Sequence, residues 1–279
     1  MLRTLLSFGL IAATTLPIAV AEAESGTGGE GAVRRTADAP ETNAGGACDC
    51  THLIYFIPSD GVDDALDVDG TITASARGQR AWFAEQMQRA PRMDRIGTSE
   101  VYDITFVRGR SPGSSYVDLR TLTTELDDRG FDDPAKRYLV YAGLDRGSTC
   151  GESTFGGPVL PGPTYAIVYL DSADCGARNL GNLGRGDALA AHEWLHAEGI
   201  TPPTAIHHCP ASPHHVCTGA LHLVPATLGI TDPERSDIMY PYVETRLSAK
   251  VLDRDRDDYL DHGIPGGQDL RASIFLEAA

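Results

Sequence analysis

The pentapeptide at residues 192–196 reads His-Glu-Trp-Leu-His, and it constrains the local fold more than any other feature of the chain. Two imidazoles four residues apart lie on one face only if the segment is helical, where both can reach one metal ion. Glu193 follows the first histidine, so its carboxylate can act as general base toward a water whose pKa zinc lowers to about 7. The spacing therefore predicts a helix that carries a zinc site.

The flanking residues also favour a helix. Asp187 can cap its start, Ala188–Ala191 are good helix formers, and Gly199 can end it before Pro202. We expect about three and a half turns. The competing interpretation is a surface helix with two solvated histidines, and the apolar residues around them argue against it: Leu189, Trp194 and Leu195.

The N-terminus predicts export. Residues 1–21 combine Arg3, an apolar run and a small-x-small cleavage signal, which is typical of a secretory signal peptide rather than a membrane anchor. The net charge of -16 argues against nucleic acid or an anionic membrane as partner, because either requires a basic face. We expect a secreted, extracellular monomer.

Six cysteines suit an oxidising compartment, where an even number permits full pairing. Local closure of the chain predicts a disulfide between Cys150 and Cys175 and another between Cys209 and Cys217. The Cys48-Asp49-Cys50 sequence is harder to place. A metal or redox role is possible, but structural disulfides to other partners are the favoured interpretation.

The composition separates an N-terminal segment that is poor in large apolar residues from the rest of the chain. Residues 22–46 have few large apolar side chains and are expected to be a disordered linker or pro-segment. Residues 47–279 are expected to form one domain, with an N-terminal subdomain to about 199 and a C-terminal subdomain at 200–279. Periodicity predicts strands at 53–57, 101–107, 138–141 and 165–170, helices at 75–90 and 117–128, and a small helical stretch at 257–262. This alternation indicates a mixed sheet covered by helices.

Two motifs in order resemble the metzincin clan of zinc peptidases. His192-Glu193-x-x-His196-x-x-Gly199 is similar to the clan's active-site helix, whose glycine turns the chain toward a third ligand. Residues 236–241, Ser-Asp-Ile-Met-Tyr-Pro, look like the clan's Met-turn, whose methionine, here Met239, lies beneath the metal. The resemblance implies an α+β, zincin-like fold with an active-site helix and an irregular C-terminal subdomain.

The third ligand departs from this pattern. The clan commonly places it three residues after the glycine, and that residue is Pro202, which cannot bind a metal. The candidates farther along are His207, His208, His214, His215 and His222. If Cys209 and Cys217 close a loop that projects from the site, His222 follows in an apolar context suited to a fixed imidazole. His222 is therefore the favoured third ligand, with His215, His207 and His208 as alternatives.

Two further patterns remain open. Tyr240 or Tyr242 is a candidate donor to a developing oxyanion, as a tyrosine near this turn is in some metzincins. Residues 253–258, Asp-Arg-Asp-Arg-Asp-Asp, resemble the opening of a calcium loop but lack its glycine at the sixth position and its glutamate at the twelfth. A charged helix start is the favoured interpretation of this segment.

Taken with the resemblance, the sequence predicts a secreted zinc endopeptidase acting on a peptide or protein substrate. His192, His196 and His222 would bind Zn²⁺, and Glu193 would be the general base and then the general acid. The alternative is an exported zinc-binding or interaction domain of the same fold without peptidase activity, which the proline at position 202 supports.

Overall fold

The computed structural model describes residues 34–36, 48–96, 100–157, 163–200, 205–210, 212, 214–218, 232–264 and 268–279. Val33–Ala279 form one unit, and Met1–Ala32 form another that contains no described residue. The predicted signal peptide, 1–21, therefore lies outside the described residues, as does most of the segment 22–46. Within the described part of the chain, no helix is long and apolar enough to cross a bilayer.

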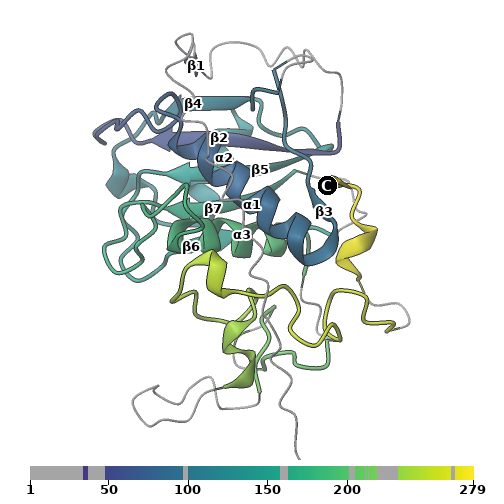
Figure 1. Cartoon of the computed structure of the whole chain (residues 1–279). Coiled ribbons are helices and arrows are strands. Elements are labelled where there is room, and N and C mark those ends of the chain that lie inside the picture. Colours follow the sequence, from purple (N-terminus) through teal and green to yellow (C-terminus); the bar gives the residue numbers. More distant parts are fainter. Residues whose placement is uncertain are drawn as a thin grey trace, which may run out of the picture. The chain divides into compact units, whose positions relative to one another are not determined.

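The main sheet is mixed and mostly parallel. Its order is β1-β4-β2-β5-β7-β6 (Figure 1). These strands are β1 (Arg35–Thr36), β2 (Cys50–Ile57), β4 (Ile104–Arg108), β5 (Lys136–Ala142), β6 (Gly151–Ser153) and β7 (Thr164–Tyr169). All neighbours are parallel except β6, which runs antiparallel to β7 at one edge. The predicted mixed sheet is confirmed, although β1 lies in the segment 22–46, for which we expected no folded structure.

Helices cover both faces of this sheet (Figure 1). They are α1 (Thr71–Met87), α2 (Leu119–Asp127) and α3 (Arg185–Ala197). Tyr55 of β2 shares a hydrophobic cluster with Phe83 of α1 and Trp194 of α3, whereas the adjacent Phe56 shares a second cluster with Leu122 of α2. Because successive side chains of a strand point to opposite faces, α1 and α3 cover one face and α2 covers the other.

The second sheet was missed by the sequence patterns. Helix α1 starts four residues before the predicted position 75 and ends at Met87, because Gln88 adopts a left-handed conformation with φ 60°. The chain then forms β3 (Arg89–Pro91), which pairs antiparallel with β8 (Leu276–Ala278). This pairing attaches the end of the chain beside α1.

After α3, the described residues form short, irregular elements. They are the 3-10 helices η4 (Pro233–Ser236), η5 (Leu247–Ala249) and η6 (Leu270–Ala272), with β8 at the end. The helix predicted at 257–262 is wrong: the carboxylate of Asp253 accepts the main-chain N–H of Tyr259 at 2.7 Å and that of Leu260, so these amides do not form helical bonds. Met239 and Phe275 nevertheless belong to the same hydrophobic cluster as α1 and α3.

Helix α3 starts two residues before the predicted cap. Gly184 is the N-cap, and Asp187 lies in the first turn, where its carboxylate accepts the N–H groups of Gly184 at 2.8 Å and Gly181 at 3.0 Å. The hydroxyl of Ser75 in α1 donates to the same carboxylate at 2.5 Å. Asp187 therefore satisfies amides at the helix start and attaches α3 to α1. As predicted, the chain turns at Gly199, whose φ is 74°.

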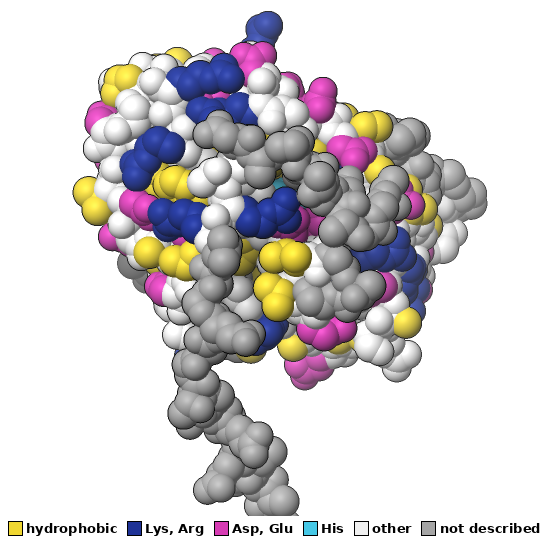
Figure 2. All heavy atoms as spheres, turned by 90° about the horizontal axis from the view of Figure 1, so that it is seen from above, with side chains coloured by type: hydrophobic (Ala, Val, Ile, Leu, Met, Phe, Trp, Pro, Cys, Tyr) yellow, Lys and Arg dark blue, Asp and Glu magenta, His cyan; other side chains and the backbone are white. Residues whose placement is uncertain are grey.

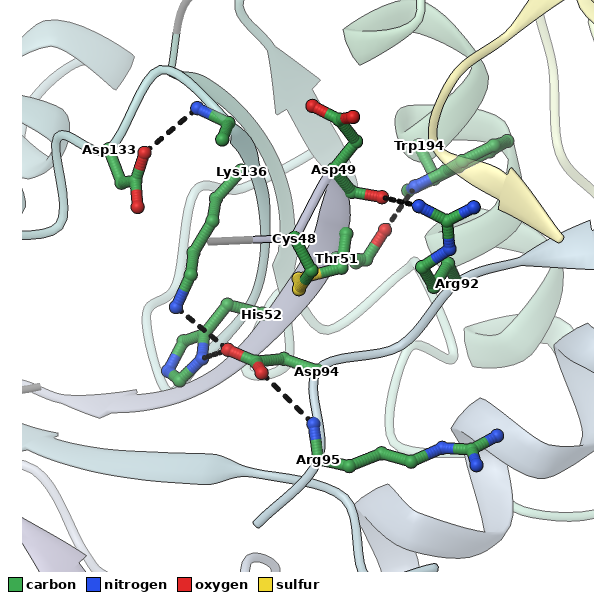
Figure 3. The surroundings of a disulfide bond; sticks show 12 residues. Cys48, Asp49, Thr51, His52, Arg92, Asp94, Arg95, Asp133, Lys136 and Trp194 are labelled. Carbon is green, nitrogen blue, oxygen red and sulfur yellow. Dashed lines mark hydrogen bonds and ion pairs between the residues drawn. A yellow bond between two sulfur atoms is a disulfide. The ribbon is translucent and has the colours of Figure 1, made fainter. Parts of the chain in front are cut away.

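The disulfides agree with two of the three expectations. Cys150 pairs with Cys175, and Cys209 pairs with Cys217. Cys48 and Cys50 pair with each other, so the expectation of other partners is wrong. Figure 3 shows that this disulfide lies near a buried group in which Asp94 accepts a hydrogen bond from Lys136 at 2.7 Å and contacts His52 at 3.0 Å. The other four cysteines pair among themselves, so Cys48 and Cys50 bond to each other.

Figure 2 looks from above Figure 1, toward the edge of the sheet at β1 and β4. Lys and Arg side chains on this face lie among Asp and Glu side chains. Ion pairs of this part of the chain include Arg34 with Asp67 at 2.6 Å and Arg95 with Glu100 at 2.9 Å. The visible charges are thus interspersed, and the expectation that the chain binds no nucleic acid stays a prediction.

Candidate metal centre

Three histidine rings converge beside helix α3. The Nε2 atoms of His192 and His196, one helical turn apart, are separated by 3.1 Å. The Nε2 atom of His215 lies 3.2 Å from that of His192 and 3.3 Å from that of His196. The three nitrogens thus form a nearly equilateral triangle.

This triangle fits a zinc ion. Nitrogen ligands about 2.0–2.1 Å from a tetrahedral zinc lie about 3.3 Å from one another. Burial is the largest cause that lowers the pKa of His192 to about 3, and the nearby His215 is the second. Burial also lowers the pKa of His196 well below its usual value. Both rings are therefore neutral at pH 7, which is the form that binds a metal.

The opposite ring nitrogens have partners that orient two of the rings. The Nδ1 atom of His192 donates to the carbonyl oxygen of Ile238 at 2.6 Å. The Nδ1 atom of His215 lies 3.1 Å from the hydroxyl oxygen of Ser212. Such outer contacts fix the tautomer of a ligating histidine and hold its other nitrogen toward the metal.

Met239 lies in a buried turn beside these rings, with no exposed surface. Its N–H donates to the carboxylate of Asp237 at 2.7 Å, and its carbonyl accepts the N–H of Val216 at 3.0 Å. The turn therefore contacts Val216, the residue after His215. Ile238, in the same turn, contacts His192. The position of Met239 beneath a bound metal stays a prediction.

Glu193 faces the edge strand β6. The residue is 6% exposed. The hydroxyl of Ser153 donates to the main-chain carbonyl of Glu193 at 2.6 Å and lies 3.1 Å from its carboxylate. Burial raises the pKa of Glu193 to about 8. A β-carbon on Gly151 would lie 2.6 Å from the Cγ and Oε1 atoms of Glu193, so the glycine leaves the space that this carboxylate occupies.

A cleft of about 660 Å³ opens onto the three histidines and Glu193. Strand β6 forms part of its wall, together with Phe155, Tyr242 and Glu244. Phe155 is half exposed and packs against His214 with 3.9 Å between ring centroids. Tyr242 is also about half exposed, whereas Tyr240 is buried in a cluster with Cys209 and Cys217.

The favoured third ligand, His222, lies outside the described residues. Among the described histidines, His215 is the one that joins His192 and His196. His207 instead contacts Asp258, with 3.1 Å between its Nδ1 atom and a carboxylate oxygen. His208 pairs through its main chain with Val216 in an antiparallel bridge.

The sequence favours His222 only if the loop closed by Cys209 and Cys217 projects from the site. In the structure, the N–H of Cys209 donates to the carbonyl of His215 at 2.8 Å, and the N–H of Cys217 donates to that of His207 at 2.8 Å. These bonds and the disulfide hold the loop's two arms together. One sequence feature could have indicated His215 as a ligand: it lies two residues before Cys217, which forms a disulfide with Cys209.

Comparisons with known proteins give little similarity. No family model matches the chain, and no curated protein sequence matches it. Two solved structures of OgpA from Akkermansia muciniphila match 58% of this chain, at 15% identity with a TM-score of 0.35 and at 14% identity with a TM-score of 0.36. The first is a catalytically inactive OgpA in complex with an O-glycopeptide substrate, and the second is the wild type. The matches cover 50% and 51% of those chains, so this chain spans about half their length.

Proposed function

We propose that this chain is a secreted, zinc-dependent endopeptidase of zincin-like fold, related to the metzincins. His192, His196 and His215 would hold the zinc ion. The observation that carries the proposal is the convergence of three Nε2 atoms, 3.1–3.3 Å apart, in a cleft that Glu193 also lines. Three histidine ligands with an open fourth position are typical of a catalytic zinc site.

Zinc, when bound, supplies Lewis acidity, which lowers the pKa of water and polarises a carbonyl group. Burial favours the protonated form of Glu193, but the charge of a cation bound beside it would favour the ionised form. Glu193 would then take the proton from the attacking water and pass it to the leaving amine. The hydroxyl of Ser153 would keep its carboxylate in place. We assign the hydrogen bond to a developing oxyanion to Tyr242, because this side chain lines the cleft and Tyr240 does not reach solvent.

The peptide substrate would bind along strand β6. This strand is the last in the sheet order, pairs on one side with β7, and contributes its three residues, 151–153, to the cleft wall. An extended peptide can add a strand to such an edge through main-chain hydrogen bonds. The peptide bond to be cleaved would then lie beside Glu193.

The test is cleavage of a denatured protein by the purified chain, blocked by a chelator and restored by zinc. Glu193→Gln should lower the rate at least about 100-fold while zinc stays bound, because only the proton transfer is lost. The matched control is Glu85→Gln, the same change on an exposed carboxylate of α1, which should leave the rate unchanged.

Two results would overturn the proposal. If Glu193→Gln cleaves as fast as the parent, Glu193 is not the general base. If the parent binds one equivalent of zinc but cleaves none of a panel of unfolded proteins, the chain is a zinc-binding domain without peptidase activity.

A further inference from the structure

A second group of metal-ligating side chains lies apart from the three-histidine centre. One nitrogen of His207 and one carboxylate oxygen each from Glu234 and Asp258 lie within 4.8 Å of one another. Glu234 belongs to η4, and the other two residues come from separate irregular segments. The cluster therefore joins three segments that are distant along the chain.

His207 and Asp258 are already in contact. The main-chain N–H of His207 donates to one carboxylate oxygen of Asp258 at 2.6 Å, and the His207 Nδ1 atom lies 3.1 Å from the other. Asp258 is 1% exposed. Asp257 adds a further carboxylate oxygen 3.6 Å from the same Nδ1 atom.

The contact between His207 and Asp258 does not account for the third member of the cluster, Glu234. The residue is 3% exposed, and within the described ranges its carboxylate makes no hydrogen bond or ion pair, although the charges of His207 and Arg254 act on it. Arg254, whose charge acts on Glu234, donates its hydrogen bond to the carbonyl of Pro233 instead. Burying a carboxylate without a partner is costly, so such groups are normally paired or bind a metal.

The charges of the cluster favour a bound cation. Glu234 and Asp258 together carry two negative charges when both are ionised, and protonated His207 would supply only one positive charge. A divalent cation would neutralise both carboxylates and leave the imidazole free to bind as a neutral ligand. An imidazole nitrogen with carboxylate oxygens suits zinc and similar transition metals, whereas calcium prefers oxygen ligands alone.

We propose that His207, Glu234 and Asp258 bind a second divalent cation of the zinc class. This site does not depend on the proposed peptidase activity. The cation would connect the segment that carries His215 to the segment that leads into Met239, because the carbonyl of His207 accepts the N–H of Cys217 at 2.8 Å and η4 directly precedes Asp237. Its role would be to hold His215 in position.

The experiment counts zinc bound to the purified full chain after saturation and dialysis, by elemental mass spectrometry. The parent should bind two equivalents, Glu234→Gln one, His196→Ala one, and the double variant none. The matched control is Asp255→Asn, the same change on an exposed carboxylate beside the cluster, which should keep two equivalents. Circular dichroism checks that each variant is folded, and His207→Gln replaces Glu234→Gln if the latter is not.

The results separate this site from the three-histidine centre. If the parent binds one equivalent that His196→Ala loses and Glu234→Gln retains, the second site is wrong and the proposed catalytic centre stands. If the single equivalent is lost in Glu234→Gln alone, the second site stands and the catalytic centre is wrong. If the cluster binds calcium but no zinc in the same assay, its assignment to the zinc class is wrong.

Discussion

The Nδ1 atom of His192 donates a hydrogen bond to the carbonyl oxygen of Ile238 across 2.6 Å. A carbonyl oxygen only accepts, so the proton of this neutral ring is on Nδ1, and Nε2 presents a lone pair toward His196 and His215. The next carbonyl, of Met239, accepts the N–H of Val216 at 3.0 Å. Two successive carbonyls of one turn thus orient the first histidine of the site and hold the segment of the third.

His215 is expected to be the third zinc ligand. His215→Ala should weaken zinc binding by more than about 100-fold, because losing a ligand costs more than losing one of its outer contacts, and should abolish cleavage. His222→Ala should change neither. Zinc affinity measured with a chelating indicator checks both variants. Retention of zinc by His215→Ala together with its loss in His222→Ala would restore the ligand favoured from the sequence.

Gly151→Ala is expected to reduce the rate without removing zinc. The added β-carbon would lie 2.6 Å from two atoms of the Glu193 side chain and displace the carboxylate. A displacement of about 1 Å at a catalytic group costs about 100-fold in rate. Steady-state kinetics with zinc analysis checks this expectation. Gly113→Ala is the control, because its nearest contact would be an ordinary 3.5 Å; equal rates for both variants would contradict the assigned position of Glu193.

The buried pair of Arg137 and Glu198 is expected to support the end of α3. Both side chains are almost fully buried, and they are 2.9 Å apart. Arg137→Met would leave a buried carboxylate without its charge partner and should lower the free energy of unfolding by about 3–5 kcal/mol. Urea denaturation measures this loss in the free energy of unfolding.

The exposed pair of Arg110 and Asp128 provides the control for this measurement. Its members are 3.3 Å apart, with more than half of each side chain exposed. Arg110→Met should cost no more than about 1 kcal/mol, because exposed pairs are weak. If the two variants lose the same stability, burial of the Arg137 pair contributes nothing.

The sequence predicts the elements that repeat a regular pattern. Strand β2 and helix α3 were found because apolar runs and helix-forming residues report local preferences. Strands β3, β6 and β8 are three residues each, too short for a period, and depend on partners distant in the chain. Two of these three pair with each other, so neither carries a signal by itself.

The candidate site was predictable where its residues share one helix. His192, Glu193 and His196 follow from spacing alone, because helix geometry fixes their relative positions. The position of His215 depends on a disulfide and on main-chain bonds to a turn that comes later in the sequence, which spacing does not encode. Gly151 was missed for the same reason: its role depends on contact between β6 and α3.

Asp94 is expected to make stability depend on pH in the acid range. Burial alone would raise its pKa, but the hydrogen bond and charge of His52, together with Lys136, lower the pKa from 3.8 to about 2 (Figure 3). A carboxyl whose pKa is lower in the folded state stabilises the fold above its unfolded pKa and loses this effect as pH falls through the folded pKa. The contribution should therefore be complete above about pH 5 and be lost as pH falls toward about 1–2, with a size of about 2 kcal/mol.

Asp94→Asn tests this expectation. Urea denaturation at pH 6, 4 and 2.5 should show the variant less stable than the parent at pH 6, with a difference that narrows toward pH 2.5, where the parent's carboxyl is becoming protonated. Asp255→Asn, on an exposed residue, should follow the parent at every pH. A difference between Asp94→Asn and the parent that stays constant from pH 6 to 2.5 would mean that the lost packing or hydrogen bonding of Asp94, rather than its charge, stabilises this part of the fold.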